Sequence, residues 1–480
     1  MAMCNWIQPG VKKRLDGKLV DPSHVYYPCA VSSLLRTLEI VYTQSGHIQQ
    51  TSSFGMEDAE TRPRKMPRAG ADSGLTLFAL RLAKTLAEGV NDAGKNMVFS
   101  PVSIYSALAL VAAGARGDTL DELLAVLGAA SRDELAELVV GMADGALADR
   151  PRGLIVAFAW SLWHEKTVLI KPAYRAVAAE SYKTEIHAVD FEDKAEESRE
   201  EINNWVSNAT KQRITSILPE GSVHRFTRLV IANVIYFKGA WNKPFPERYT
   251  DDGLFYRLDG SKVRVPFMSS QQDQFVEWYH GFKVLKLPYC QDSILQAESD
   301  DERHGSEESD ERSQFSMVIL LPDDRRGLPS LVERMASKPS FLWDHLPDSS
   351  DMVGEFLLPK FKISFSSEIN GVLKYMGIKM AFDEHKADLK DMLEEDKTKL
   401  LPTKDPSVDL YVEKVMHKAF IEVNEAGTEA AASTTCSMRV KQSARRVNFV
   451  ADHPFAFFVV EEAISDSPPA NTFSRIYPTD

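Results

Sequence analysis

Two kinds of hydrophobic periodicity appear along the chain from residue 74 onward. Apolar residues recur with helical spacing in GLTLFALRLAKTLAEG (74–89), in SPVSIYSALALVAAGARGDTLDELLAVLG (100–128) and in ESREEINNWVSNATKQRI (197–214). Such spacing gives a helix one apolar face, so these segments are predicted to be helical. Within the second segment, a Ser-Pro pair starts one helix and a glycine ends it, and a second helix is expected to follow.

Other segments are rich in β-branched and aromatic residues and are bounded by polar residues, proline or glycine. They are RLVIANVIYFKG (228–239), FSMVILLP (315–322), GEFLLPKFKISFS (354–366) and NFVADHPFAFFVV (448–460). Runs of this kind are typical of strands that are buried on at least one face. Helices and strands do not alternate strictly. The predicted class is therefore α+β, with the early helices on one side of large, mainly antiparallel sheets.

Composition narrows the classes of function. The chain has 480 residues, of which 44% are hydrophobic and 26% charged, with a net charge of −13. This composition is typical of a globular protein. The negative charge argues against a nucleic-acid partner, because phosphate binding needs a concentrated basic face. No apolar run approaches the roughly 20 residues that span a bilayer, so no membrane partner is expected.

The cysteines and the N-terminus indicate a compartment. Four scattered cysteines, without CxxC spacing, suit a reducing environment and no structural zinc; they are Cys4, Cys29, Cys290 and Cys436. The first residues lack the continuous apolar core of a secretory signal. A cytoplasmic location is therefore expected, and an extracellular one is left open.

Two segments differ from the rest of the chain. Residues 1–72 show no sustained period and contain the basic run TRPRKMPR, so we expect them to lie outside the fold, as a disordered extension or an artefact of the gene model in which Met56 is the true start. ESDDERHGSEESDERS (298–313) carries eight acids, two bases and no apolar residue. Such a segment cannot bury enough surface to order itself, and an acidic surface loop is predicted.

No signature of an enzyme is present. GxSxG, GxGxxG, a Walker loop, HExxH and paired CxxC motifs are all missing from the sequence. The pairs His164-Glu165 and Asp452-His453 are isolated, and such a histidine is usually a hydrogen-bonded structural residue. The sequence therefore predicts no enzyme activity, no catalytic residue, no metal and no cofactor.

The stretch EAGTEAAASTTCSMRVKQSARR (425–446) fits neither pattern. When residues 428–441 are divided by parity, the even positions are small or apolar and the odd ones mostly polar or charged. That is the pattern of a strand half-buried on a sheet. It runs for about 14 residues where strands usually have about 5 or 6, and its alanines also favour a helix. The stretch is expected either to adopt two conformations or to be a linker before the next strand.

Five blocks of the sequence resemble the serpin family, and in particular the plant serpins of the Z type. The blocks are FSPVSIYSALALVAAGARGDTLDELL, ANVIYFKGAWNKPF, LPKFKISFSSEINGVLKYMGIKMAF, VMHKAFIEVNEAGTEAAAS and NFVADHPFAFF. The resemblance covers roughly residues 73–462. It implies the serpin fold, with about nine helices around three mainly antiparallel sheets in one unusually large domain and an exposed reactive-centre loop at 425–447.

The resemblance implies a suicide mechanism of protease inhibition. A protease attacks the reactive loop and forms an acyl-enzyme, after which the loop inserts as a new strand into the main sheet. The insertion carries the protease to the far pole and distorts its active site, so each inhibitor molecule is consumed by one protease. Small even-position residues suit this process, because they enter a packed sheet without costly rearrangement.

The family loop length implies where the protease cuts. Counting about sixteen residues from Glu425 places the reactive bond between Lys441 and Gln442. A lysine there implies partners that cleave after basic residues, either trypsin-like serine proteases or metacaspase and papain-like cysteine proteases. The segment after this bond is shorter than usual in the family, which leaves open other cleavage points, namely Arg439, Arg445 and Arg446. A monomer is expected.

Three further groups of residues carry over from the family as parts of the insertion machinery. The hinge of the loop comprises Glu425, Gly427, Thr428, Ala430, Ala431 and Ala432. The shutter, a buried polar cluster under the sheet, comprises Ser100, Ser103, Asn233 and His417. The breach, where insertion begins, comprises Trp241 and Lys360, and the resemblance implies an ion pair of Lys360 with Glu425.

The C-terminal tail, 463–480, departs from the family. Serpins of this kind continue after VVEE into a short turn and a buried apolar strand, whereas this chain reads AISDSPPANTFSRIYPTD. Pro468 and Pro469 lack the N–H donors of a central strand, so either the gene model runs through a splice site here or the core lacks one strand. An alternative function follows, in which the protein is a non-inhibitory or defective serpin that acts as a binding or storage protein.

Overall fold

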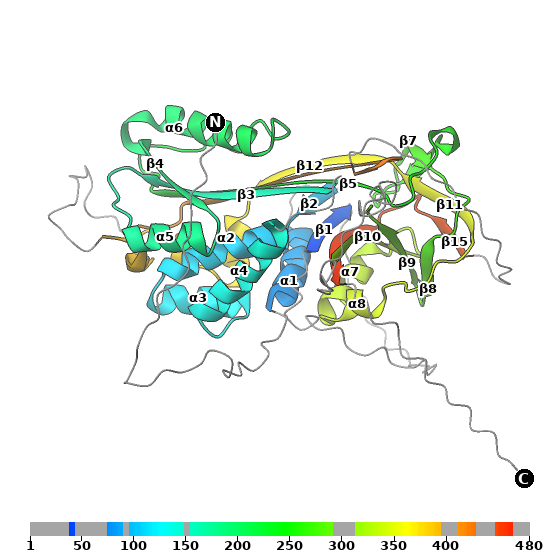
Figure 1. Cartoon of the computed structure of the whole chain (residues 1–480), viewed down its shortest axis with the longest axis horizontal. Coiled ribbons are helices and arrows are strands. Elements are labelled where there is room, and N and C mark those ends of the chain that lie inside the picture. Colours follow the sequence, from blue (N-terminus) through cyan, green and yellow to red (C-terminus); the bar gives the residue numbers. More distant parts are fainter. Residues whose placement is uncertain are drawn as a thin grey trace, which may run out of the picture. The chain divides into compact units, whose positions relative to one another are not determined.

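The computed structural model describes most of the chain in seven segments. They are residues 38–43, 74–89, 96–147, 154–290, 313–394, 410–428 and 447–463. All of them belong to one compact unit, Leu34–Asp480. These residues form nine α-helices and sixteen strands in three sheets, as the α+β class predicted (Figure 1).

Some of the helices begin at a residue whose side chain caps the helix, as α2 and α6 show. At the start of α2, the Ser100 hydroxyl accepts a hydrogen bond from Ser103 N (3.3 Å), and a proline follows Ser100. α6 starts earlier than predicted, because the Asp190 carboxylate caps it by accepting from Asp193 N. The nine helices are α1 (Gly74–Gly89), α2 (Pro101–Gly114), α3 (Gly117–Leu127), α4 (Arg132–Leu147), α5 (Pro172–Glu180), α6 (Phe191–Ala209), α7 (Leu328–Ser337), α8 (Phe341–Asp344) and α9 (Asn370–Met376). None of these helices combines the length and the apolar character needed to span a bilayer.

The central sheet has six strands in the order β12-β13-β14-β5-β3-β4. Its strands are β3 (Leu154–Glu165), β4 (Glu185–Val189), β5 (Leu229–Ala240), β12 (Phe361–Glu368), β13 (Lys414–Asn424) and β14 (Gly427–Thr428). β13 lies antiparallel to β12 and parallel to β5. This sheet therefore mixes both senses: one parallel pair, β5 with β13, lies in the middle, and another, β3 with β4, lies at one edge.

The second sheet has the order β2-β1-β16-β10-β9-β8. Its strands are β1 (Leu38–Thr43), β2 (Asn96–Phe99), β8 (Phe275–Tyr279), β9 (Phe282–Pro288), β10 (Ser313–Pro322) and β16 (Ala456–Ala463). The expectation that residues 1–72 lie outside the fold is wrong for β1, which pairs antiparallel with β2 and β16. Six residues give too short a pattern to show that a distant sheet will accept them. The tail was expected to leave the core without one strand. β1, from the other end of the chain, supplies an additional strand of this sheet.

The third sheet has the order β15-β11-β7-β6. Its strands are β6 (Asp251–Tyr256), β7 (Lys262–Met268), β11 (Val353–Pro359) and β15 (Val447–Val450). Two runs that were each predicted as one strand are in fact divided between sheets: 354–366 becomes β11 and β12, and 448–460 becomes β15 and β16. The reason is local, because Pro359 cannot donate to a ladder and the turn residues Asp452 to Pro454 interrupt the second run.

Helices cover the central sheet on both faces. In Figure 1, α6 lies on one side of this sheet, and α2 lies on the other. Alternate residues of β5 belong to the two layers: Val230 and Ala232 pack with α6, whereas Leu229 and Ile231 pack with the helices around α2. The apolar cluster around α2 also contains residues of the second sheet. A separate apolar cluster fills the space between the three sheets. The middle of the central sheet is therefore buried on both faces.

Candidate functional site

The central sheet carries an inserted piece of chain between β5 and β13. The two residues of β14 pair antiparallel with both neighbours, and Thr428 lies opposite Val423 of β13 and Gly239 of β5. Further along, Lys414–Phe420 of β13 pair directly and in parallel with Val230–Tyr236 of β5. We call this pairing the β5–β13 seam. At one end of the seam β14 lies between β5 and β13, and along the rest these two strands pair directly.

The two residues of β14 are shaped for this position. Gly427 has φ +150°, and a Cβ there would overlap the Gly239 carbonyl oxygen and lie 2.7 Å from Ala240 Cα. Only glycine fits, because both obstacles are backbone atoms. Thr428 is completely buried, and its hydroxyl lies 2.9 Å from the Tyr289 hydroxyl. A larger side chain at either residue would displace the surrounding backbone or the packed rings.

An ion pair fixes the start of the loop beside this insertion point. The Lys360 ammonium lies 2.8 Å from Glu425 Oε2, and the Thr250 hydroxyl donates to Glu425 Oε1 (2.8 Å). Burial alone would raise the pKa of Glu425, but the hydrogen bonds from Lys360 and Thr250 outweigh it and hold the pKa below its ordinary value. The carboxylate is therefore ionised near neutral pH, and the pair predicted from the resemblance is formed.

A tight turn directs the chain from β13 back into the sheet. The Asn424 side-chain oxygen accepts from the backbone N–H groups of Ala426 (3.0 Å) and Gly427 (3.2 Å). The Trp241 indole donates to the Asn424 carbonyl (3.0 Å) and stacks on Tyr289 with a centroid distance of 4.7 Å. Asparagine is a typical turn residue because its side chain substitutes for backbone acceptors. The turn and the stacked rings together direct β14 into the end of the seam.

The four predicted shutter residues meet in one buried hydrogen-bond network under the seam. Ser100 N donates to His417 Nε2 (3.2 Å), so the ring proton is on Nδ1 and is donated to Asn233 Oδ1 (2.8 Å). Ser103 Oγ donates to the same Asn233 oxygen, and Asn233 Nδ2 donates to the Ser103 carbonyl (2.7 Å). Burial lowers the pKa of His417 from 6.5 to about 3, so the ring is neutral. The network links α2 to both strands of the seam.

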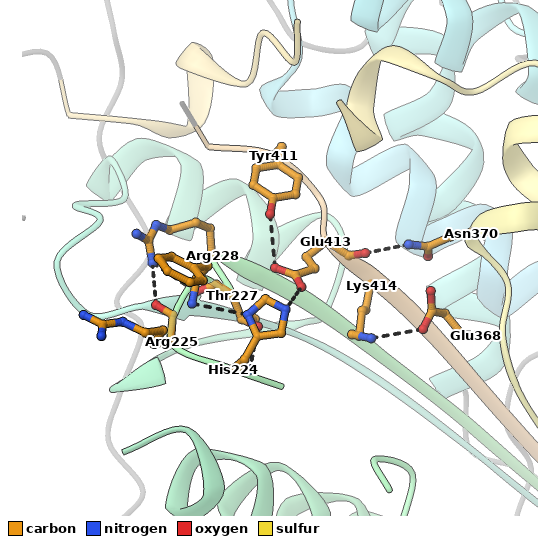
Figure 2. Close-up of polar contacts among 10 residues, drawn as sticks. His224, Arg225, Thr227, Arg228, Glu368, Asn370, Tyr411, Glu413 and Lys414 are labelled. Carbon is orange, nitrogen blue, oxygen red and sulfur yellow. Dashed lines mark hydrogen bonds and ion pairs between the residues drawn. The ribbon is translucent and has the colours of Figure 1, made fainter. Parts of the chain in front are cut away.

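A second polar group holds the closed end of the seam (Figure 2). His224, in the segment before β5, lies 2.9 Å from Glu413, the residue before β13. Tyr411 donates to the same carboxylate (3.3 Å), and burial and the Glu413 charge raise the pKa of Tyr411 to about 12. The Asn370 side chain donates to the Glu413 carbonyl (2.5 Å) and accepts from Val415 N (2.8 Å). The contact of His224 with Glu413 joins the segments that lead into β5 and β13, which must separate if a strand is to enter fully, whereas Tyr411 and Asn370 hold Glu413 and the start of β13 in place.

The structure describes some of the predicted site residues, and the others lie outside the described residues. The hinge residues Glu425, Gly427 and Thr428 lie at the insertion point, together with the breach residues Trp241 and Lys360. Outside the described residues lie the remaining hinge positions, the predicted reactive bond and its alternatives, namely Ala430, Ala431, Ala432, Lys441, Gln442, Arg439, Arg445 and Arg446.

Sequence reasoning missed several residues of the site, among them Asn424, Tyr289 and Glu413. Asn424 had an available signal, because asparagine before an acid, an alanine and a glycine is typical of a turn. Tyr289 and Glu413 had none, since each acts through partners far away in the sequence. Their roles depend on the tertiary structure.

The two isolated histidine–acid pairs make structural contacts. His164 Nδ1 donates to the Glu165 carbonyl (2.9 Å), and Arg175 donates to its other nitrogen (2.8 Å). Burial lowers the pKa of His164 to about 4. His453 contacts the Asp452 carboxylate and the Pro322 carbonyl, both at 2.7 Å. Each ring thus has both nitrogens engaged by the fold.

Comparison with known proteins gives a consistent match. The serpin family model, described as a serine protease inhibitor, matches residues 73–466. Serpin-Z2A of rice (Oryza sativa subsp. japonica) is 50% identical over 422 residues, covering 82% of this chain and 95% of the relative. Serpin-Z2B of rice is 49% identical over 414 residues, with the same coverage. AtSerpin1 of Arabidopsis, solved in a native stressed conformation, is 35% identical with a TM-score of 0.68, covering 81% of this chain and 97% of that one.

The fold and these matches define the class of protein. The described residues form three sheets and nine helices, with a hinge inserted at the end of the central sheet, and the chain aligns with a plant serpin structure over 97% of that structure's length. This chain belongs to the serpin family, whose members are mainly protease inhibitors, and its relatives include the plant serpins of the Z type.

Proposed function

We propose that this protein is a suicide inhibitor of proteases that cleave after lysine or arginine. The observation that carries the proposal is the position of β14, which already occupies the end of the β5–β13 seam and pairs with both strands. Continued insertion of the following residues would extend two existing ladders in the same register. The native stressed conformation recorded for AtSerpin1 is consistent with a fold that has such an insertion still to make.

The register of β14 indicates how the loop would extend. Each step forward from Thr428 is matched by one step back along β5 and one step back along β13. Continued in this way, Thr434 comes level with Asn233 of β5 and with His417 of β13, which are themselves paired in the closed sheet. An inserted Thr434 would therefore replace the hydrogen bond between the two shutter side chains and offer its own hydroxyl to both.

Full insertion would open the whole seam. Residues 428–441 are long enough to run along all of β5, and the small even-position side chains would face the buried side on which Thr428 already lies. The direct β5–β13 pairing would be broken, together with the contact of His224 and Glu413. The new strand offsets this loss with hydrogen bonds to both neighbours and with the burial of its apolar positions.

The covalent step would use the bond between Lys441 and Gln442. The protease serine or cysteine attacks the Lys441 carbonyl and forms an ester or thioester, and the amine of Gln442 leaves with the proton delivered by the protease. Insertion before hydrolysis would then trap the acyl-enzyme. The partners are a trypsin-like serine protease or a metacaspase or papain-like cysteine protease, and the inhibitor acts as a monomer.

The test of this function is the substitution Lys441→Glu. A like charge would then face the acid of a trypsin-like pocket, so we expect the rate of inhibition to fall by at least ~100-fold and the SDS-stable complex with trypsin to disappear. Arg439→Glu and Arg445→Glu are the matched controls and should leave complex formation intact. Loss of the complex in a control, and not in Lys441→Glu, would move the reactive bond. Cleavage of the unmodified protein without any complex would favour the alternative, a binding or storage protein.

A further inference from the structure

In the second sheet, the N-terminal strand β1 occupies the place between β2 and β16 and joins these two strands. Ile40 pairs with Phe99 of β2 on one side and with Phe458 of β16 on the other, and both pairings are antiparallel. In the described part of the sheet, β2 and β16 are not neighbours. The ladder between them therefore runs through β1 alone, and β1 comes from a part of the chain that precedes the region matched by the family model.

Both faces of this place are buried. Phe99 and Phe458 belong to the apolar cluster beneath the helices, whereas the adjoining Val98 and Phe457 belong to the cluster between the sheets. All four side chains are at most 2% exposed. Helices α1 and α2 also approach β1. If the place were empty, backbone N–H and C=O groups of β2 and β16 would lie unpaired in apolar surroundings, which is strongly unfavourable.

The sequence of β1 suits a strand buried in this way. LEIVYT contains three β-branched residues and a tyrosine, residue types that favour strands. The tail that follows β16, residues 464–480, offers no comparable run and contains Pro468 and Pro469. The chain therefore has one segment suited to this place near its beginning and none near its end.

The connection between β1 and the rest of the fold determines which copy of the strand is bound. About thirty residues, 44–73, separate β1 from α1. A tether of this length gives the attached strand an effective concentration on the order of millimolar. A strand from a second molecule would have to compete at the much lower concentration of the protein itself, so the segment of the same chain is favoured.

We propose that the place between β2 and β16 is a strand-binding site for an extended apolar segment, and that its occupant is Leu38–Thr43 of the same chain. The site binds the segment through two antiparallel ladders and two apolar faces. Because the strand is delivered on a tether and is not continuous with either neighbour, a peptide of the same sequence can replace it. Residues before Met56 are then part of the folded protein. This holds whether or not Lys441 is the reactive residue.

The first test compares the full chain with one that begins at Met56 and with one that begins at Leu34. We expect the chain from Leu34 to melt like the full chain, and the chain from Met56 to melt at least ~5 °C lower or without cooperativity. A synthetic peptide of residues 34–47 should restore the melting midpoint of the chain from Met56. The same peptide with Val41→Pro should not, because proline removes a ladder donor. Equal midpoints for the full chain and the chain from Met56 would overturn the proposal.

A second test uses the full-length protein and does not depend on the folding of a truncated chain. Val41→Pro lies within β1, and Val25→Pro is the matched control outside it. We expect only Val41→Pro to lower the melting midpoint and to raise the rate of amide hydrogen exchange at 97–99 and 457–460 by at least ~10-fold, because opening of the ladder exposes these groups. Identical exchange in the two variants would overturn the site. A full chain that elutes as a dimer, and whose exchange protection falls on dilution, would instead show that the strand comes from a second copy.

Discussion

At the residue scale, the side chain of His417 matters most for the proposed mechanism, because it joins the two strands of the closed seam. It is fully buried, accepts from Ser100 N and donates to Asn233 on the neighbouring strand. Burial keeps its pKa near 3, so the neutral ring can accept and donate at once. A protonated ring could not accept from Ser100 N, and the network would lose one of its links.

The depressed pKa of His417 predicts acid sensitivity. Between the ordinary value of 6.5 and about 3, the unfolded chain binds a proton at this residue that the folded protein does not. The free energy of unfolding should therefore fall as pH decreases through this window, by about 1.4 kcal/mol per pH unit from this residue. His417→Gln removes the titration, so its urea-unfolding free energy should fall less steeply from about pH 6 to about pH 4. His385→Gln, at an exposed histidine, is the control. An equal slope in His417→Gln and the unmodified protein would contradict the assignment.

β14 is the feature that matters at the element scale, since it is both the end of a turn and the beginning of a strand. Its direction is fixed by Asn424 and by the ion pair of Glu425 with Lys360. Its register is fixed by Gly427, where any Cβ meets the backbone of β5. A flexible linker, the alternative interpretation of this stretch, would not need glycine or a buried threonine at these two residues.

A charge on the buried face of β14 should convert an inhibitor into a substrate. Thr428→Arg would place an unpaired guanidinium where the present side chain is 0% exposed, which is costly in an apolar environment. We expect the loop to be cleaved normally but the yield of SDS-stable complex with trypsin to fall at least ~10-fold, since hydrolysis would outrun insertion. Glu429→Arg, on the opposite parity, is the matched control and should keep trapping the protease. Normal trapping by Thr428→Arg would show that the division into two faces is wrong.

At the scale of the whole molecule, the proposed function requires that the described state is not the most stable one. The middle of the central sheet pairs β5 directly with β13, and full insertion would break polar contacts in the middle of this seam, between His417 and Asn233, and at its closed end, between His224 and Glu413. The gain is a complete additional strand with a neighbour on each side. The balance favours insertion only once the loop is free to enter, which cleavage allows.

Cleavage in the loop should therefore raise the stability of the whole molecule. After a cut near Lys441, residues 428–441 can become a full strand, and we expect the melting midpoint of the nicked protein to exceed that of the intact protein by at least ~10 °C. The measurement is a thermal melt before and after limited digestion with trypsin, with mass spectrometry locating the cut. Cutting an ordinary exposed loop leaves stability unchanged or lowers it, so equal midpoints would exclude insertion.

Much of the fold could be predicted from local patterns. The helical spacing of 74–89 gave α1 with both ends, and the apolar run 228–239 gave β5 to within one residue. The split of 354–366 into β11 and β12 was missed, although Pro359 signals it, because the pattern of apolar residues continues across the proline. For the site, family motifs brought Ser100, Ser103, Asn233 and His417 into one group before any distance was known.

The sequence by itself determined the class of the protein, several of the helices and the alternation of small and polar residue types along the loop, because periodicity, capping residues and family motifs are local properties of the chain. Only the tertiary structure decided that β14 is inserted next to Gly239, that His224 meets Glu413, and that Leu38–Thr43 lies between β2 and β16. Each of these pairings joins residues that are distant in the sequence. A strand does not carry the identity of its partner in its own pattern, because the partner is selected by the free energy of filling a place that exists only when the rest of the sheet is formed.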